Sequence, residues 1–161
     1  MITEDYVSLE VAKLLKERGF KEWCSYFYGT AVRHNGEDID EDEEYELKAE
    51  GRGDEIEYVE GGHLYHFNCN NSKEDINIWA CPTQSLAMKW LRGKGFHINA
   101  SISYDYSEDA DGNIVDKWTF WLFEIFSSFG GDIIYTEEVN EYDSYEQAVE
   151  AALKYSLENL I

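Results

Sequence analysis

Residues 97–105 read HINASISYD, a stretch in which polar and apolar side chains alternate strictly. One face carries the apolar set, Ile98, Ala100, Ile102 and Tyr104. A period of two predicts a half-buried antiparallel strand. After the turn SEDADGN, residues 114–126 (IVDKWTFWLFEIF) are apolar at both parities, so we expect a central strand covered, at least in part, on both faces. A further turn, SSFGGD, leads to a third predicted strand over residues 133–137.

The two parities of the apolar stretch can be assigned different roles. One consists of Trp118, Phe120 and Leu122, and the other of Trp121, Phe123 and Ile125. Aromatic and aliphatic side chains at this density are typical of a buried core. A parity that helices leave uncovered would instead form an interface with a partner or a second copy.

Three helices are predicted around these strands, each with an apolar stripe at a spacing of three to four residues. Their N-caps are Ser8, Thr83 and Ser144, the last in a capping box with Gln147. The first helix ends at Gly19, the second at Gly93 and Gly95, and the third runs from Tyr145 to about Leu160. Further strands are predicted over residues 25–33, 55–59, 63–69 and 76–80, with Gly61 and Gly62 joining the second and third of them.

The predicted order of elements is therefore α-β-β(β)-β-α-β-β-β-α. Strands follow strands through short turns, which favours an α+β fold with a mostly antiparallel sheet and three packed helices. A chain of 161 residues has the usual size of one domain, so we expect residues 1–161 to form a single domain.

The negative charge of the chain is concentrated in one segment. The formal net charge is -21, and residues 37–60 alone hold 13 acidic and 2 basic side chains. We expect an exposed acidic loop or hairpin near residues 36–55, because like charges repel and few bases are available to pair with them. A chain with this charge repels nucleic acid and anionic membrane surfaces.

A basic protein surface is the partner that this charge favours, including the nucleic-acid-binding surface of a DNA-binding protein. The candidate partner-binding residues are Asp38, Asp40, Glu41, Asp42, Glu43 and Glu44. Self-association is a second possibility, and an acidic surface that only maintains solubility is the simplest alternative.

A candidate cation site lies in the turn DADGN. Asp109, Asp111 and Asn113 have the spacing of the first three ligands of a calcium loop. However, Ile114 stands where such a loop requires glycine, and Phe120 stands where it requires glutamate. Asp and Asn beside Gly also form ordinary turns, and this second interpretation is favoured.

Three cysteines, Cys24, Cys69 and Cys81, are far apart in the sequence and form no Cys-x-x-Cys pair. This pattern favours a reducing compartment over a disulfide framework. Cys81 precedes a predicted helix N-terminus, where a thiol can become reactive, although a buried small apolar role is favoured. His63, His66 and Cys69 are metal-ligand types, but on a strand the two imidazoles diverge.

No P-loop, GxGxxG, GxSxG or HExxH motif is present, so we expect no cofactor. The N-terminus has acidic residues where a signal peptide has basic ones, and no apolar run reaches the length of a membrane span. We therefore expect a cytoplasmic location.

Three segments resemble an uncharacterised family of small bacterial proteins that phages and other mobile elements also carry. They are YVSLEVAKLLKERGF (residues 6–20), CPTQSLAMKWLRGKGFHI (residues 81–98) and YDSYEQAVEAALKYSLENLI (residues 142–161). The resemblance implies a small intracellular α+β protein and brings no activity with it. The sequence thus favours an acidic accessory protein that binds another protein without catalysis. The alternative is an enzyme or cation-binding protein whose site is not visible in sequence.

Overall fold

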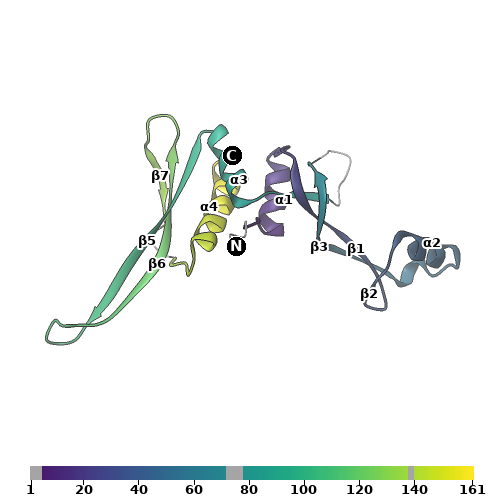
Figure 1. The fold of residues 1–161 in the computed structure, drawn as a ribbon, viewed down its shortest axis with the longest axis horizontal. Coiled ribbons are helices and arrows are strands. Elements are labelled where there is room, and N and C mark those ends of the chain that lie inside the picture. The colour runs from purple at the N-terminus through teal and green to yellow at the C-terminus, as the bar shows by residue number, and fades with distance from the viewer. Residues whose placement is uncertain (1–4, 72–77, 138–139) are drawn as a thin grey trace.

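The fold consists of two antiparallel sheets with a layer of helices between them (Figure 1). The computed structural model describes residues 5–71, 78–137 and 140–161. The first sheet contains β1 (Cys24–His34), β2 (Glu37–Asp38), β3 (Ile56–Cys69) and β4 (Ile78–Cys81). The second contains β5 (Phe96–Glu108), β6 (Ile114–Ser127) and β7 (Ile133–Thr136). The predicted α+β class and the antiparallel pairing are confirmed.

Three helices lie between the sheets, α1 (Leu9–Glu17), α3 (Gln84–Gly93) and α4 (Tyr145–Asn159). Each begins at its predicted cap, because the hydroxyls of Ser8, Thr83 and Ser144 accept hydrogen bonds from backbone N–H groups of the first turn. Gly19 ends α1 with a φ of 83°, a left-handed conformation that glycine adopts without strain.

One hydrophobic core joins the helices to both sheets. It includes side chains of α1, α3 and α4 together with Ala80 of the first sheet and Phe123 of the second, all fully or almost fully buried. Polar contacts connect the helices as well. The Glu150 carboxylate of α4 accepts hydrogen bonds from the Ser8 backbone N–H at 2.7 Å and from the Gln84 side chain at 3.2 Å.

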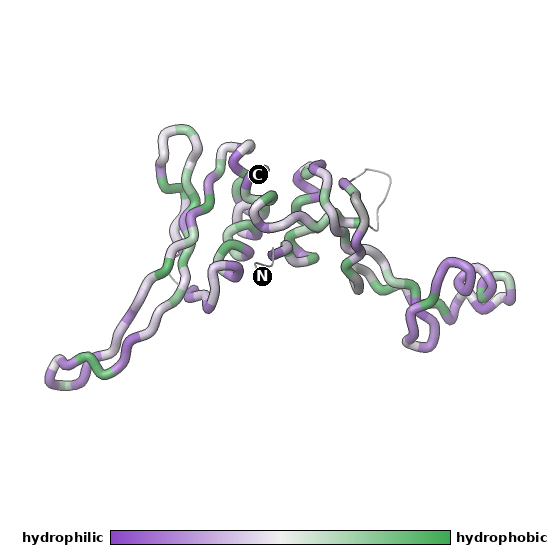
Figure 2. Tube along the Cα trace, in the orientation of Figure 1, coloured by the Kyte–Doolittle hydropathy of each residue, from purple (hydrophilic) through white to green (hydrophobic). Residues whose placement is uncertain are grey.

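Each sheet extends one long hairpin away from this core, so the molecule is elongated (Figure 1). The β1–β3 hairpin projects on one side and the β5–β6 hairpin on the other. Hydrophilic residues dominate the far end of the β1–β3 hairpin (Figure 2).

The structure corrects two predictions about the first hairpin. Residues 41–49, expected in a loop or hairpin tip, form a fourth helix, α2 (Glu41–Ala49). Residues 55–59 and 63–69 were expected as two strands, but residues 56–69 form the single strand β3 and Glu55 ends the preceding 3-10 helix. The register shifts where Gly29 is opposite His63 and Ala31 is opposite Val59. Gly61 and Gly62 lie within this irregularity, so they belong to a bulge instead of a turn.

A third correction concerns β6. Helices α3 and α4 pack against one face of the second sheet, and no helix of the described residues lies on the outer face (Figure 1). Phe123 and Ile125 on the inner face are buried, whereas Phe120 and Leu122 on the outer face are half-exposed and Trp118 is exposed. The expected coverage of both faces is therefore wrong for the outer face. Of the strand predicted over residues 76–80, residues 76 and 77 lie outside the described residues.

Candidate protein-binding surface

The six acidic residues predicted to bind a partner lie together at the far end of the β1–β3 hairpin. We call residues 37–55 the acidic tip. It contains β2, α2 and the short 3-10 helix η1 (Gly53–Glu55). No residue of α2 is buried. Ile39, before the helix, and Leu47, within it, are half-buried and line a cleft of about 280 Å³ beside α2. The apolar contact that attaches the helix to the hairpin is therefore small.

Acidic residues themselves make α2 form. The Asp40 carboxylate accepts hydrogen bonds from the backbone N–H groups of Asp42 (3.1 Å) and Glu43 (3.0 Å), and Glu43 accepts one from the Asp40 N–H (3.4 Å). This capping box satisfies N–H groups that have no partner within the helix. Carboxylates in the first turn also complement the positive end of the helix dipole. The loop prediction considered charge repulsion and overlooked the D-x-x-E signature of the box.

The bases at the tip pair with carboxylates of the tip. Arg33 contacts Asp38 at 2.7 Å, Arg52 contacts Glu55 at 2.8 Å, and Lys48 pairs with Glu44 one turn earlier in α2. Hydrogen bonds from Arg52 and His34 lower the pKa of Glu55 to about 2. Hydrogen bonds from Lys48 and Tyr58 lower the pKa of Glu44. These carboxylates are therefore ionised at neutral pH and hold the tip together.

The six predicted residues thus divide into two groups. Four of them support the tip: Asp38, Asp40, Glu43 and Glu44. Glu41 and Asp42 lie exposed in the first turn of α2. Tyr45 lies four residues after Glu41 and three after Asp42, and this spacing places the three side chains on one face of the helix. The Tyr45 side chain is 75% exposed.

Tyr45 is the functional candidate that the sequence analysis missed. An aromatic ring on the same helix face as two carboxylates can attract an arginine or lysine side chain, because the ring face and the carboxylates both attract a cation. The spacing of Glu41, Asp42 and Tyr45 carries this signal only once residues 41–49 are known to be helical.

The predicted cation site forms an ordinary turn. Asp109 Oδ1 accepts hydrogen bonds from the backbone N–H groups of Asp111 (3.0 Å) and Asn113 (2.9 Å). The Asn113 side-chain amide also donates to both Asp109 oxygens, and these hydrogen bonds lower the pKa of Asp109. Among the described residues, no three His, Cys, Asp or Glu side chains are placed to hold a metal ion. His66 lies in β3 as expected, and the side chain of His63 is outside the description.

The three cysteines, although far apart in the sequence, come together in the first sheet. Cys24 of β1 is opposite Cys69 of β3. Tyr26, two residues further along β1, is opposite Cys81 of β4. Burial raises the pKa of Cys24 and of Cys81 to about 12, and proximity to the other thiols contributes at both sites. The Cys81 thiol donates to the Val7 carbonyl at 3.5 Å. The favoured role of Cys81, a buried small side chain, agrees with this environment.

We expect Cys24 and Cys81 to resist alkylation in the native protein. A pKa near 12 leaves little thiolate at neutral pH, and both side chains are buried, so iodoacetamide should modify them at least about a hundredfold more slowly than a model thiol. Peptide mass spectrometry after timed labelling measures the rates, and urea-unfolded protein is the control. Modification of native Cys81 as fast as that of the unfolded protein would show an activated thiol.

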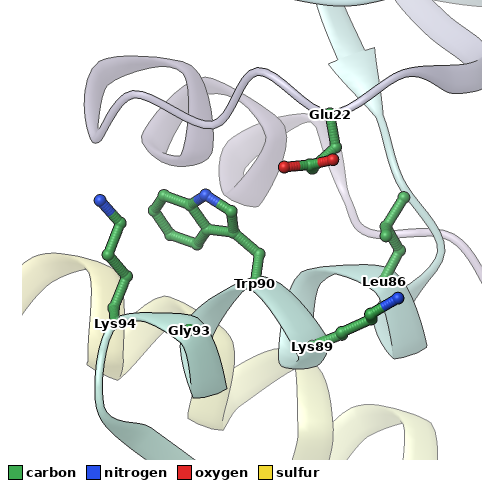
Figure 3. Close-up of a pocket in the computed structure, with 6 residues that line it drawn as sticks. All are labelled: Glu22, Leu86, Lys89, Trp90, Gly93 and Lys94. Atoms are coloured by element: carbon green, nitrogen blue, oxygen red, sulfur yellow. The ribbon is translucent and has the colours of Figure 1, made fainter.

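A second hollow lies between α3 and the segment that joins α1 to β1 (Figure 3). Its volume is about 300 Å³, and it is lined by Glu22, Leu86, Lys89, Trp90, Gly93 and Lys94. The Trp90 ring packs edge-on against Phe20 at 5.7 Å, and the Lys94 ammonium lies 5.1 Å from the Trp90 ring centroid. The lining contains one carboxylate, that of Glu22, and two ammonium groups, those of Lys89 and Lys94.

Comparison with known proteins found no match among protein families, curated proteins or solved structures. The resemblance of the three helices to bacterial and phage proteins therefore stays a prediction. None of the helices in the described part of the chain is long and apolar enough to cross a membrane.

Proposed function

We propose that this chain is a small cytoplasmic accessory protein that binds an arginine- or lysine-rich surface of another protein through its acidic tip, without catalysing a reaction. One observation carries the proposal. The exposed ring of Tyr45 shares a face of α2 with the carboxylates of Glu41 and Asp42, at the end of a projecting hairpin.

The charge of the tip supports the same partner. Residues 37–55 contain 11 acidic and 2 basic side chains, and both bases are already paired within the tip. The field outside the tip is therefore strongly negative and attracts a basic surface from a distance. The helix is preformed by its capping box, so binding requires little further ordering of this segment.

Neutralising the exposed face tests the proposal. We expect the double variant Glu41→Gln, Asp42→Asn and the single variant Tyr45→Ala each to raise the Kd for a fluorescent oligo-arginine peptide at least about fivefold. The same Kd should rise about tenfold or more between low and physiological ionic strength, because salt screens the attraction. Fluorescence anisotropy measures both effects, and thermal unfolding verifies that each variant is folded.

A matched control removes the same charge elsewhere. Glu141→Gln with Asp143→Asn changes two exposed carboxylates that lie before α4, far from the tip. We expect this variant to bind the peptide within about twofold of the unmodified protein. An equal loss of affinity in the control would mean that only net charge matters, and the acidic tip would then serve solubility alone.

A further inference from the structure

The outer edge of β5 has no partner strand in the described part of the chain. The order in the second sheet is β5-β6-β7, so β5 is an edge strand over its full 13 residues. An exposed edge presents a row of backbone donors and acceptors to any strand that can reach it.

The hydrogen bonds of β6 show which groups of β5 point outward. Trp121 and Tyr142 exchange two backbone hydrogen bonds, of 2.8 and 3.0 Å, on the side of β6 away from β5. Ile102 is directly opposite Trp121, so this pair makes no hydrogen bonds between β5 and β6. The Ile102 N–H and C=O therefore point away from the sheet, and those of alternate residues do the same. Tyr106 is one of these alternate residues, and its backbone N–H donates to the Asp105 carboxylate at 2.8 Å instead of to β6.

The same alternate residues carry exposed apolar side chains. Ile102, Tyr104 and Tyr106 are 62%, 61% and 44% exposed, although they continue the face that buries Ile98 beneath the helices. Natural edge strands usually carry a lysine or a proline that prevents pairing with another chain, and β5 contains neither. In the described part of the chain this edge is thus unpaired, and its two carboxylates, Asp105 and Glu108, lie near its end, so residues 96–104 carry no Asp, Glu, Lys or Arg.

We propose that β5 pairs with β5 of a second copy, antiparallel and centred on Ile102, so that the two sheets form one continuous sheet. Ile102 is the midpoint of Phe96–Glu108, so this register overlaps the whole strand. It places Ala100 opposite the partner's Tyr104 and Ile98 opposite the partner's Tyr106, in hydrogen-bonded pairs.

Charge and polarity are compatible with this register. On the polar face, Asn99 is opposite the partner's Asp105, and Ser101 is opposite the partner's Ser103. Glu108 is opposite the partner's Phe96, so no carboxylate of β5 faces another across the new pair. From Ile98 to Tyr106, the alternation places each apolar side chain opposite an apolar one of the partner, which is the feature that selects a second copy as the occupant.

The oligomeric state tests the proposal. We expect the protein to sediment as a dimer, and we expect Ile102→Lys to raise the dimer Kd at least about tenfold, since it places two ammonium groups side by side at the centre. The matched control is Ile114→Lys, which makes the same substitution in the same hairpin, but on β6. The Ile114 side chain is 61% exposed, almost as much as that of Ile102. It should leave the dimer intact. A monomeric unmodified protein, or equal effects of the two variants, would overturn the proposal.

A cysteine crosslink tests the register. In the proposed register Ile102 faces its copy in a hydrogen-bonded pair, whose Cα atoms lie about 5.5 Å apart, within the range of a disulfide. In a Cys69→Ser background, mild oxidation should crosslink Ile102→Cys into a covalent dimer and leave Ile114→Cys uncrosslinked. Crosslinking of Ile114→Cys alone would contradict the register.

The dependence on salt distinguishes dimer formation from peptide binding at the acidic tip. Two copies of a chain with a charge of -21 repel each other, so raising the salt concentration should strengthen the dimer. Binding of a basic peptide at the tip should weaken under the same change. The two proposals can therefore fail independently.

Discussion

Replacing Phe123 by alanine is expected to lower the free energy of unfolding by about 3–5 kcal/mol, as for other large aromatic side chains removed from a core. Phe123 lies in the middle of β6, is 1% exposed and belongs to the common core. Its ring lies 5.8 Å from that of Tyr135 and 6.0 Å from that of Tyr142. The variant loses this packing and leaves a cavity that neighbouring side chains fill only in part. Urea unfolding monitored by circular dichroism measures the change.

Phe120→Ala is the matched control, because Phe120 has the same chemistry on the opposite face of the same strand. It is half-exposed, so its loss should cost about 1 kcal/mol. Similar costs at the two positions would mean that the outer face of the sheet is covered in solution. A cost below about 2 kcal/mol for Phe123→Ala would contradict its place in the core.

The parts of the fold that could be predicted from sequence are those set by local signals. Residues 97–105 alternate, and β5 follows that alternation. Ser8, Thr83 and Ser144 cap the helices that they were predicted to cap. In each case a hydrogen bond or a side-chain period within a few residues specifies the element, so no knowledge of distant contacts is needed.

The features that were not predicted depend on contacts between distant segments. Apolar residues at both parities of β6 do not reveal whether a second layer covers the outer face. Gly61 and Gly62 permit a turn or a bulge, and the pairing of β3 with β1 decides between them. The prediction of a loop over residues 41–49 was wrong for a different reason. The helix is specified locally, by the capping box of Asp40 and Glu43, but the prediction considered only like-charge repulsion and overlooked the box.

The candidate site follows the same division. The cluster of carboxylates could be found from composition, while their separate roles could not. Asp38 and Glu44 pair with bases that the hairpin and α2 bring to them. Tyr45 becomes a candidate only through the helical spacing that places it beside Glu41 and Asp42.

Asn71, which lies two residues beyond the end of β3, shows how a polar side chain can hold distant segments together. It is only 7% exposed. Its side-chain amide donates to the Phe20 carbonyl at 3.1 Å, and its side-chain oxygen accepts from the Ala80 N–H at 2.9 Å. The amide thus connects the end of the α1 segment to β4, which are distant in the chain. A polar residue in a stretch of Asn and Ser carries no sequence signal for such a bridge.

Asn71→Ala is therefore expected to lower the free energy of unfolding by about 2–3 kcal/mol, because it leaves the Phe20 carbonyl and the Ala80 N–H without partners in a buried environment. Asn70→Ala, which makes the same change one residue earlier at a half-buried position, should alter the stability by about 0.5 kcal/mol or less. Urea unfolding of both variants measures the difference. Equal values would mean that water replaces the Asn71 amide without cost, and the contact between the α1 segment and β4 would then depend on apolar packing alone.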